Sequence, residues 1–298
     1  MVMMDGGVHL SEGEDAGRAT LAQAHRQGWF TGAGGLRLFR QTWRPAGQPR
    51  AALLNIHGLG DHSGLYPTLV DHCMTCRFVV HSHDLRGNGR SPGPRAYVER
   101  WEEYRQDLER FVATVRSEEG DLPLFLLGNS LGGLIVLDYA LHRPDGLRGI
   151  IAASPPLGRL GVPGPLLALG RVLSRVWPSF SVRTGMDLSG LARDPTVVET
   201  VLADPLFHRV GTARLSTEVV AAIARVQDGA PRFPLPLLVL HGSADRMVPP
   251  DGSRAFVSRV GHPDHELHEY AGAYHVLFAD LDRERVLADV EQWIVARL

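Results

Sequence analysis

The chain has 298 residues, of which 44% are hydrophobic and 21% are charged, a composition that supports a large buried core and excludes a disordered or fibrous protein. The 31 basic residues nearly balance the 33 acidic ones, and a formal charge of -2 provides no field that would attract nucleic acid. Every basic residue is an arginine, which excludes Schiff-base chemistry and the phosphate-binding lysine of P-loop enzymes.

The N-terminal region is polar and carries no recognisable targeting signal. Its first 28 residues are acidic in the middle and lack the apolar stretch of a signal peptide, so residues 1–27 are interpreted as an extension. The longest uncharged run, residues 122–137, includes three glycines and is shorter than the roughly 20 residues that span a bilayer. We therefore expect a cytoplasmic protein that is at most peripheral at membranes.

From Trp29 onward, apolar runs alternate with helical patterns. A hairpin is predicted over Trp29–Thr31 and Leu36–Trp43. Further strands are predicted at Ala51–Ile56, Phe78–Val80, Leu124–Leu127, Gly149–Ala153, Leu235–Leu240 and Glu266–Tyr270. Helices are predicted at Tyr66–Cys76, Val98–Glu118, Leu131–His142, Ser253–Val260 and Asp282–Leu298. This order predicts an α/β fold with a mainly parallel sheet that is covered by helices on both faces.

The alternation is interrupted between Pro155 and Pro234, where no strand is predicted. Helical patterns occur there at Pro165–Trp177, Asp194–Ala203 and Ser216–Val226. We predict that residues 155–234 form an inserted helical cap, or lid, over the carboxyl ends of the strands. Residues 28–154 and 235–298 would then form the catalytic core.

One segment of the predicted cap has an apolar stripe at helical spacing. The stripe consists of Leu166, Leu167, Leu169, Val172, Leu173, Val176 and Trp177. Arg171 and Arg175 lie one turn apart on another face of the same helix. We predict that the cap touches lipid aggregates or a membrane surface, and that Leu173 and Trp177 contact the acyl chain of a substrate. The alternative is that the stripe packs onto the core.

Two serines fit the pattern G-x-S-x-G, and the chemistry of the turn distinguishes them. A nucleophile elbow needs a strand before the serine, a helix after it and a backbone N–H on the next residue. Ser130 follows a predicted strand and precedes Leu131 and a predicted helix, whereas Ser91 precedes Pro92, which has no N–H. We therefore predict that Ser130 is a catalytic nucleophile.

A serine nucleophile requires a histidine base, which a carboxylate holds in one tautomer. Asp245 follows the predicted strand Leu235–Leu240, and His275 follows the last predicted strand and precedes the last helix. Both residues are expected at the carboxyl ends of strands, where sheet enzymes of this kind place their sites. Asp84 and Asp280 remain alternative acids.

Backbone N–H groups close to Ser130 are expected to stabilise an oxyanion. Leu131 provides one of them, and the second is predicted in the loop that begins at His57. Leu59 is the predicted donor there, because Gly58 and Gly60 allow the loop to fold tightly.

Clusters of histidine and cysteine raise the question of a metal. The His-rich stretches at residues 81–84 and 262–268 lack a third ligand group at a convincing spacing. Cys73 and Cys76 lie at the predicted C-terminal end of a helix, where the dipole disfavours a thiolate. We predict reduced structural thiols, and we expect no metal, no cofactor and no nucleic-acid partner.

Five motifs occur in a specific order along the chain. They are HGLGDHSGLY at 57–66, DLRGNGRSPG at 84–93, GNSLGG at 128–133, HGSADRMVP at 241–249 and YHVLF at 274–278. Together they resemble the α/β-hydrolase fold and, within it, the monoacylglycerol lipase and lysophospholipase-like group. Residues 28–39 and 191–208 resemble bacterial members. The resemblance implies hydrolysis of a small lipid or ester through an acyl-enzyme intermediate, with Ser130, His275 and Asp245 as the catalytic triad.

The sequence departs from the pattern of this family at two places. Asn129 stands where the family usually has histidine or another ring, which leaves the elbow intact. In the mammalian lipases an acidic and a basic residue help to hold the glycerol head group, and the corresponding positions here are Asp61 and Leu65. Without the basic partner, we expect weak discrimination between glycerol and simple alkyl leaving groups.

Other activities stay open as alternatives. Within the same fold these are lysophospholipase, thioesterase and C–C hydrolase. A more remote alternative is an NAD(P)-dependent reductase, because G-x-G follows a strand and Asp84 lies at the distance of a ribose ligand. Ser63 replaces the third glycine of that fingerprint, and the catalytic lysine is absent. A hydrolase-like binding protein is the other remote alternative, although such a protein would normally have lost one member of the triad.

Overall fold

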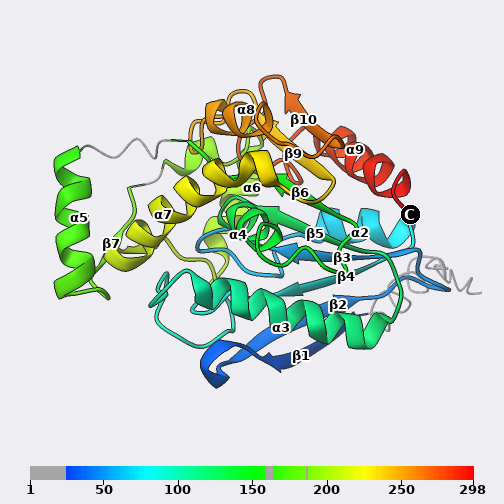
Figure 1. Cartoon of the computed structure of the whole chain (residues 1–298), viewed down its shortest axis with the longest axis horizontal. Helices are drawn as coiled ribbons and strands as arrows, with labels where there is room; N and C mark the ends of the chain where they lie inside the picture. The colour runs from blue at the N-terminus through cyan, green and yellow to red at the C-terminus, as the bar shows by residue number, and fades with distance from the viewer. Residues whose placement is uncertain (1–24, 159–163, 186) are drawn as a thin grey trace, which may run out of the picture.

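An eight-stranded sheet forms the centre of the structure, a computed structural model that describes residues 25–158, 164–185 and 187–298 (Figure 1). Its strands are β1 (His25–Thr31), β2 (Arg37–Trp43), β3 (Ala51–Ile56), β4 (Phe78–His83), β5 (Leu124–Asn129), β6 (Gly149–Ala153), β9 (Leu237–Gly242) and β10 (His265–Tyr270). They are ordered β1-β2-β4-β3-β5-β6-β9-β10. The first two pairings are antiparallel and the other pairings are parallel, so the predicted fold class is confirmed.

Helices cover the sheet on both faces, and each layer encloses its own apolar cluster. One cluster contains side chains of α3 (Glu102–Glu119), α4 (Leu131–Ala140), α7 (Ala213–Gly229) and α8 (Asp251–Val257). The other contains side chains of α2 (Pro67–Thr75) and α9 (Arg283–Val295). Consecutive residues of the inner strands alternate between the two clusters, as a strand buried on both faces requires.

Strand β4 extends three residues beyond the prediction, which ended at Val80. The added residues His81, Ser82 and His83 are polar, and all three are buried. Ser82 Oγ donates to the backbone oxygen of Asn55 at 2.7 Å, and His81 Nε2 lies 3.0 Å from Glu119 Oε1. These partners come from distant parts of the chain, so the hydropathy of the sequence gives no sign of them.

Unlike the side chains of His81 and Ser82, that of His83 has no polar partner among the described residues, and its ring is enclosed by aromatic groups. It lies 5.4 Å from the Phe30 ring and 4.5 Å from the Phe111 ring, measured between centroids. Neither ring nitrogen has a hydrogen-bond partner within the described part of the chain. Burial, with a smaller effect of His57, lowers the pKa of His83 from 6.5 to about 3. The imidazole is therefore neutral in the folded protein at neutral pH.

Replacing His83 by leucine is expected to make the protein less sensitive to acid. Below pH 6.5 His83 becomes protonated in the unfolded chain but stays neutral in the folded protein. The unfolding free energy of the wild type therefore decreases as the pH falls from 6.5 toward 3. Between pH 8 and pH 5 the wild type should lose about 2 kcal/mol more unfolding free energy than His83→Leu. Urea unfolding of both proteins at both pH values measures this difference, and equal losses would contradict it.

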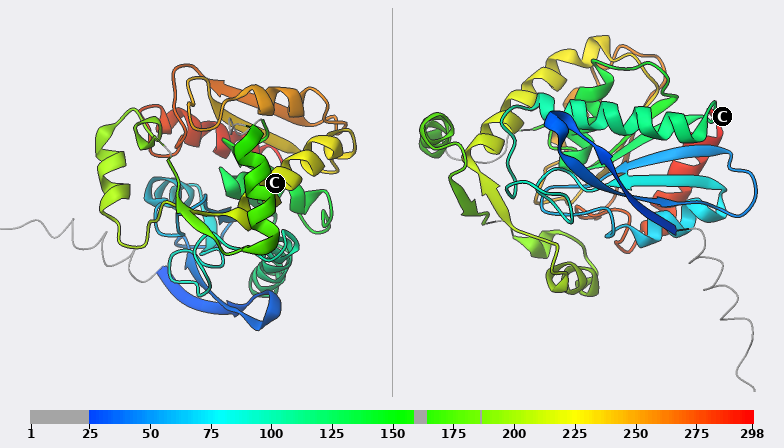
Figure 2. Two further views of the ribbon diagram at one scale, coloured as in Figure 1. Left: turned by 90° about the vertical axis from the view of Figure 1, so that its left-hand side faces the viewer. Right: turned by 90° about the horizontal axis from the view of Figure 1, so that it is seen from below.

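The segment between β6 and β9 contains α5 (Gly164–Val176), β7 (Ser181–Arg183), α6 (Pro195–Ala203), β8 (Val210–Thr212) and α7. The prediction that this segment lacks strands is wrong, because β7 and β8 pair as a small antiparallel sheet. Each strand has only three residues, too few for a recognisable alternation. Figure 2 shows this small sheet connecting α5 to the rest of the segment.

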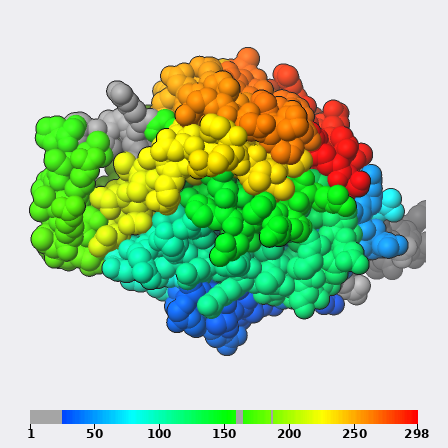
Figure 3. Space-filling view, in the orientation of Figure 1, coloured from blue at the N-terminus to red at the C-terminus, as the bar shows by residue number. Residues whose placement is uncertain are grey.

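Helices α5 and α7 relate differently to the core. Helix α7 buries Leu215, Ala222 and Val226 in the same cluster as α3 and α4, and so it forms part of the core packing. Helix α5 lies at the edge of the molecule, against one end of α7 (Figures 1 and 3). Ser174 Oγ of α5 lies 2.8 Å from Thr217 Oγ1 of α7. The division of the chain into core and cap stays a prediction.

Candidate active site

Ser130 lies on a sharp turn between strand β5 and helix α4. Its backbone has φ 52° and ψ -118°, a conformation that L-residues rarely adopt and that is typical of strained functional turns. The Ser130 N–H donates to the oxygen of Ala153 at 2.8 Å, which ties the turn to β6. The strand, turn and helix therefore have the arrangement predicted for a nucleophile elbow.

The two glycines of the elbow are required by the close approach of the backbone. A Cβ on Gly128 would lie 2.2 Å from the oxygen of Gly132. A Cβ on Gly132 would lie 2.1 Å from the oxygen of Ile56 on β3. Because these neighbours are backbone atoms, they cannot move aside as a flexible side chain would. Both glycines of the G-x-S-x-G pattern thus have a steric explanation.

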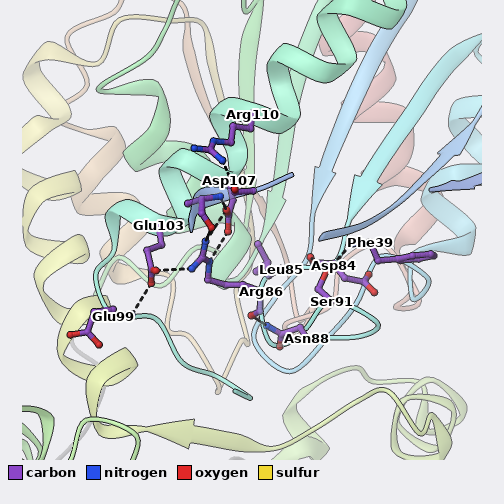
Figure 4. A network of polar contacts seen from close by, with 12 residues as sticks. Phe39, Asp84, Leu85, Arg86, Asn88, Ser91, Glu99, Glu103, Asp107 and Arg110 are labelled. Atoms are coloured by element: carbon purple, nitrogen blue, oxygen red, sulfur yellow. Dashed lines mark hydrogen bonds and ion pairs between the residues drawn. The ribbon is translucent and has the colours of Figure 1, made fainter. Parts of the chain in front are cut away.

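Ser91, the other serine in such a pattern, belongs to a buried structural loop (Figure 4). Its hydroxyl accepts from the N–H of Phe39 at 2.9 Å and donates to the oxygen of Asp84 at 2.7 Å. In the same view, Arg86 bonds Asp107 through Nε at 2.7 Å and Nη2 at 2.9 Å. The Asp107 carboxylate also accepts from the N–H of Ala33, so the network joins the loop after β4 to α3 and the first hairpin.

His275 and Asp245 lie within hydrogen-bond distance of each other. His275 Nδ1 is 2.7 Å from Asp245 Oδ2, and both side chains are buried. The other carboxylate oxygen, Oδ1, accepts from the N–H groups of Met247 and Val248, each at 2.9 Å. Burial alone would raise the pKa of Asp245, but the contacts with His241, His275 and the Val248 N–H hold it well below its usual value. Asp245 is therefore ionised at neutral pH.

The two alternative acids lie in other hydrogen-bond networks. Asp84 accepts from the N–H of Ser63 at 2.8 Å and from the N–H of Arg90 at 2.7 Å. These bonds also occupy the carboxylate that the reductase alternative assigned to a ribose. Asp280 accepts from the backbone N–H and the Nε of Arg193, at 2.9 and 2.8 Å. Asp245 is the acid that the fold brings to His275.

An apolar cavity of about 80 Å³ lies over the elbow. It is lined by Gly58, Leu59, Asp61, Leu65, Tyr66, Asn129, Ser130, Leu188, Leu191, Val201, Phe207, Met247, His275 and Val276. Ser130 and His275 thus face the same space, although no hydrogen bond joins their side chains in the described residues. Such contacts are often long without substrate.

Two backbone N–H groups beside Ser130 have no hydrogen-bond partner in the described part of the chain. The N–H groups of Leu59 and Leu131 form no hydrogen bond within residues 25–158, 164–185 and 187–298. A Cβ on Gly58 would lie 3.3 Å from Ser130 Cβ, so the loop that carries Leu59 passes directly over the elbow. These are the two residues that the sequence predicted as oxyanion donors, and both lie beside Ser130.

The predicted substrate contacts divide into two groups. Asp61 and Leu65 line the cavity with Ser130. Leu173 does not, because it lines a separate apolar cavity of about 420 Å³ between α5, β7 and α7. Trp177 is 59% exposed at the end of α5. Neither residue of α5 reaches the elbow in this structure, which departs from the prediction.

Several wall residues of the cavity escaped the prediction. Leu188, Leu191, Val201 and Phe207 come from the segment 188–207, whose apolar residues do not mark one face of a single helix. For Leu191, Val201 and Phe207 the only signal was the resemblance of residues 191–208 to bacterial family members, and Leu188 had none. Tyr66 was also missed; its hydroxyl donates to Asp61 Oδ2 at 2.6 Å. Burial, followed by the effect of Asp61, raises the pKa of Tyr66, so the phenol stays protonated.

The loop that carries Leu59 is bonded to the segment after α6. The N–H of His208 donates to the oxygen of Gly60 at 2.9 Å, and His62 Nε2 lies 3.1 Å from Asp204 Oδ2. Gly60 has φ 76°, and a Cβ there would lie 2.0 Å from the oxygen of His208. His208 Nε2 also lies 2.8 Å from Asn88 Oδ1. These contacts connect the loop to the segment 204–208 and to Asn88.

Comparisons with known proteins agree with this arrangement. The sequence model of the family described as serine aminopeptidase, S33, matches residues 47–282. A monoacylglycerol lipase of Mycolicibacterium smegmatis is 32% identical over 90% of this chain and 96% of its own. Human monoglyceride lipase is 33% identical over 89% of each chain. The crystal structure of a Paleococcus ferrophilus monoacylglycerol lipase matches with a TM-score of 0.80 at 34% identity, covering 88% of this chain and 99% of that chain.

Proposed function

Because the chain belongs to the serine aminopeptidase S33 family of α/β-hydrolases, we propose that Ser130 is the nucleophile with which it hydrolyses monoacylglycerols and related simple esters. The chain is a serine ester hydrolase of the lipase and esterase type, and the resemblance inferred from the five motifs is confirmed. The family takes its description from a peptidase, whereas the three relatives named above are lipases. The substrate is accordingly a lipid or another ester.

One observation carries the assignment of the nucleophile. Ser130 occupies the strained turn between β5 and α4, and it lines the same cavity as His275. The Nδ1 atom of His275 lies 2.7 Å from Asp245 Oδ2. Two free backbone N–H groups lie beside Ser130. A serine, a base, an acid and oxyanion donors are the groups that acyl transfer requires.

The reaction follows from these positions. His275 Nε2 accepts the proton of the Ser130 hydroxyl while Oγ attacks the ester carbonyl, and the N–H groups of Leu59 and Leu131 bind the oxyanion. Asp245 keeps the proton of His275 on Nδ1. Collapse of the intermediate breaks the ester C–O bond, and His275 protonates the departing alcohol. Water then attacks the acyl-enzyme with His275 again as base, releasing the acid and restoring Ser130.

The cavity supports an apolar acyl group and weak selection of the alcohol. Eight of its wall residues have apolar side chains, and Asp61, which would face a glycerol head group, already accepts from Tyr66. Leu65 offers no charge to the alcohol. We therefore propose that glycerol and ethyl esters of one fatty acid react at rates within about tenfold of each other, a difference near 1.4 kcal/mol.

The test compares kcat/KM for a monoacylglycerol and for the ethyl ester of the same acid, with a serine-trapping phosphonate as inhibitor. Both esters should be hydrolysed, and mass spectrometry should find the phosphonate on Ser130. A preference for the glyceride far beyond tenfold would overturn the proposed tolerance for the alcohol. Failure to hydrolyse either ester, or a label elsewhere, would overturn the assignment of the nucleophile.

We also propose that α5 contacts lipid surfaces. Four side chains of α5 (Leu166, Leu169, Val172 and Val176) and that of Trp177, the next residue, are each between 52% and 73% exposed, an unusual density of apolar side chains for one short segment. Arg171 and Arg175 on the same helix would face lipid head groups. Among the described residues, no helix has both the length and the apolar character needed to cross a bilayer. Contact through α5 would therefore be interfacial.

Replacing both Val176 and Trp177 by serine should lower binding to phosphatidylcholine and phosphatidylglycerol vesicles about tenfold, because both side chains lose burial in the lipid interface. Vesicle co-sedimentation measures the bound fraction. Val295→Ser, on the exposed side of α9, is the matched control and should bind like the wild type. Equal binding by the α5 variant would exclude this surface.

A further inference from the structure

Three metal-binding side chains meet where the end of α2 touches α9, outside the active-site cavity. His72 lies on the last turns of α2, Cys76 follows its end, and Glu291 lies on α9. The imidazole nitrogen, the thiol sulfur and a carboxylate oxygen all lie within 4.8 Å of one another. Figure 1 shows the two helices on the same face of the sheet. Cys76 belongs to the C-x-x-C spacing noted in the sequence.

The His72 imidazole has an unsatisfied nitrogen in this cluster. The side chains of His72 and Glu291 are 27% and 36% exposed, and Nε2 forms an ion-pair contact with Glu291 Oε2 at 3.0 Å. The Nε2 atom itself is inaccessible to solvent and has no hydrogen-bond partner among the described residues. The two groups are close, yet the ring nitrogen is not oriented for a hydrogen bond to the carboxylate. Buried polar atoms are rarely left without a partner. A shared ligand between the three side chains would satisfy the nitrogen.

We propose that His72, Cys76 and Glu291 bind a divalent cation of the zinc type. One thiolate and one carboxylate balance the charge of such an ion, and nitrogen, sulfur and oxygen are its usual ligands. Tetrahedral zinc ligands lie about 3.5 Å apart. The three donor atoms lie within 4.8 Å of one another, so binding would need only small side-chain adjustments, in which His72 Nε2 and Glu291 Oε2, now 3.0 Å apart, would separate slightly. Water completes the coordination. This site departs from the expectation, drawn from the sequence, that the protein binds no metal.

Neighbouring charges affect the thiol in opposite directions. Burial raises the pKa of Cys76 to about 11, a hydrogen bond to Glu291 adds to the rise, and Thr75 and Arg50 oppose it. Binding of the ion would therefore release the thiol proton, as metal binding to cysteine does in general. Because α2 and α9 come from distant parts of the chain, the ion would cross-link them and stabilise the fold.

A second cluster of possible ligands is paired with arginine, which the first cluster is not in the described part of the chain. His81, Glu118 and Glu119 also lie within 4.8 Å of one another. Here, however, Arg40 bonds Glu118, Arg44 bonds Glu119, and His81 contacts both Thr42 and Glu119. Its donor atoms are already occupied and its charge is neutralised by arginine. The proposal therefore rests on the first cluster alone.

Titration of the full-length chain with Co²⁺, in the presence of a phosphine reductant, tests the proposal. We expect a sulfur-to-cobalt charge-transfer band that saturates at one equivalent and is displaced by Zn²⁺. The variants Cys76→Ser and His72→Asn should abolish the band. Glu291→Gln should weaken the affinity at least tenfold. Cys73→Ala, which removes the neighbouring thiol outside the cluster, should keep both band and affinity.

Thermal unfolding provides a second measurement. One equivalent of Zn²⁺ should raise the Tm of the wild type and of Cys73→Ala, and it should leave the Tm of Cys76→Ser unchanged. Proton release on zinc binding should be lost in the same variant. Absence of the cobalt band in the wild type would overturn the site. A band that survives in Cys76→Ser but disappears in Cys73→Ala would also overturn it.

Discussion

Replacing Ser130 by alanine is expected to lower kcat for ester hydrolysis by about four to six orders of magnitude. The reason is that the acyl-enzyme can no longer form, while the cavity and the two backbone donors remain. The variant should bind substrate and melt like the wild type, since the Ser130 side chain lines the cavity and no hydrogen bond of its hydroxyl occurs among the described residues. Steady-state kinetics on a short p-nitrophenyl ester measures the loss.

Ser91→Ala is the matched control, because it removes the same hydroxyl from the other G-x-S-x-G pattern. It breaks two buried hydrogen bonds, to Phe39 and Asp84, and should cost about 1–3 kcal/mol of unfolding free energy. Its kcat should stay within a few-fold of the wild type. Retention of more than a few per cent of kcat by Ser130→Ala would contradict the assignment of the nucleophile.

Replacing Asp245 by asparagine should reduce kcat about 10⁴-fold. The amide would no longer hold the proton of His275 on Nδ1, so Nε2 would lose its role as a base. Asp245 also accepts from the Met247 and Val248 N–H groups, and the asparagine oxygen can keep these two bonds. The variant should therefore remain folded, which thermal melting checks.

Asp84→Asn and Asp280→Asn are the controls for this experiment. Each keeps the size of a buried carboxylate and makes no bond to the His275 ring among the described residues, although Asp280 also accepts from the N–H of Tyr274 at 3.4 Å. Both should lose stability, because their carboxylates accept charge-assisted or backbone hydrogen bonds. Their kcat should fall by less than tenfold. A severe loss at Asp84 together with a mild one at Asp245 would reverse the assignment of the acid.

The positions of candidate site residues could be predicted from the sequence where these residues follow a buried strand directly. Asn129, Gly242 and Tyr270 end three parallel strands in the same half of the sheet, and Ser130, Asp245 and His275 come within five residues of those ends. Because apolar runs identify such strands, chain order alone predicted that the three side chains would meet. The same argument placed Leu59 after β3.

The features that the sequence did not predict depend on contacts between residues far apart in the chain. The extension of β4 through His83 and the pairing of β7 with β8 have no hydropathy signal of their own. The apolar wall formed by Leu188 to Phe207 is likewise hidden, because its residues face a cavity rather than a regular core. The meeting of Cys76 with Glu291 joins the first half of the chain to its last helix, a distance over which spacing carries no information.

The bonds between Gly60 and His208 limit how this enzyme can be recombined with its relatives. Phe207, in the segment after α6, lines the cavity, and His208 of the same segment bonds the loop that carries the Leu59 donor. A chimera that exchanges residues 188–212 alone would therefore change substrate access and disturb the oxyanion donor together. Grafts that also carry residues 57–64 and Asn88 would keep the donor in place. Specificity and rate would then become separable for directed evolution.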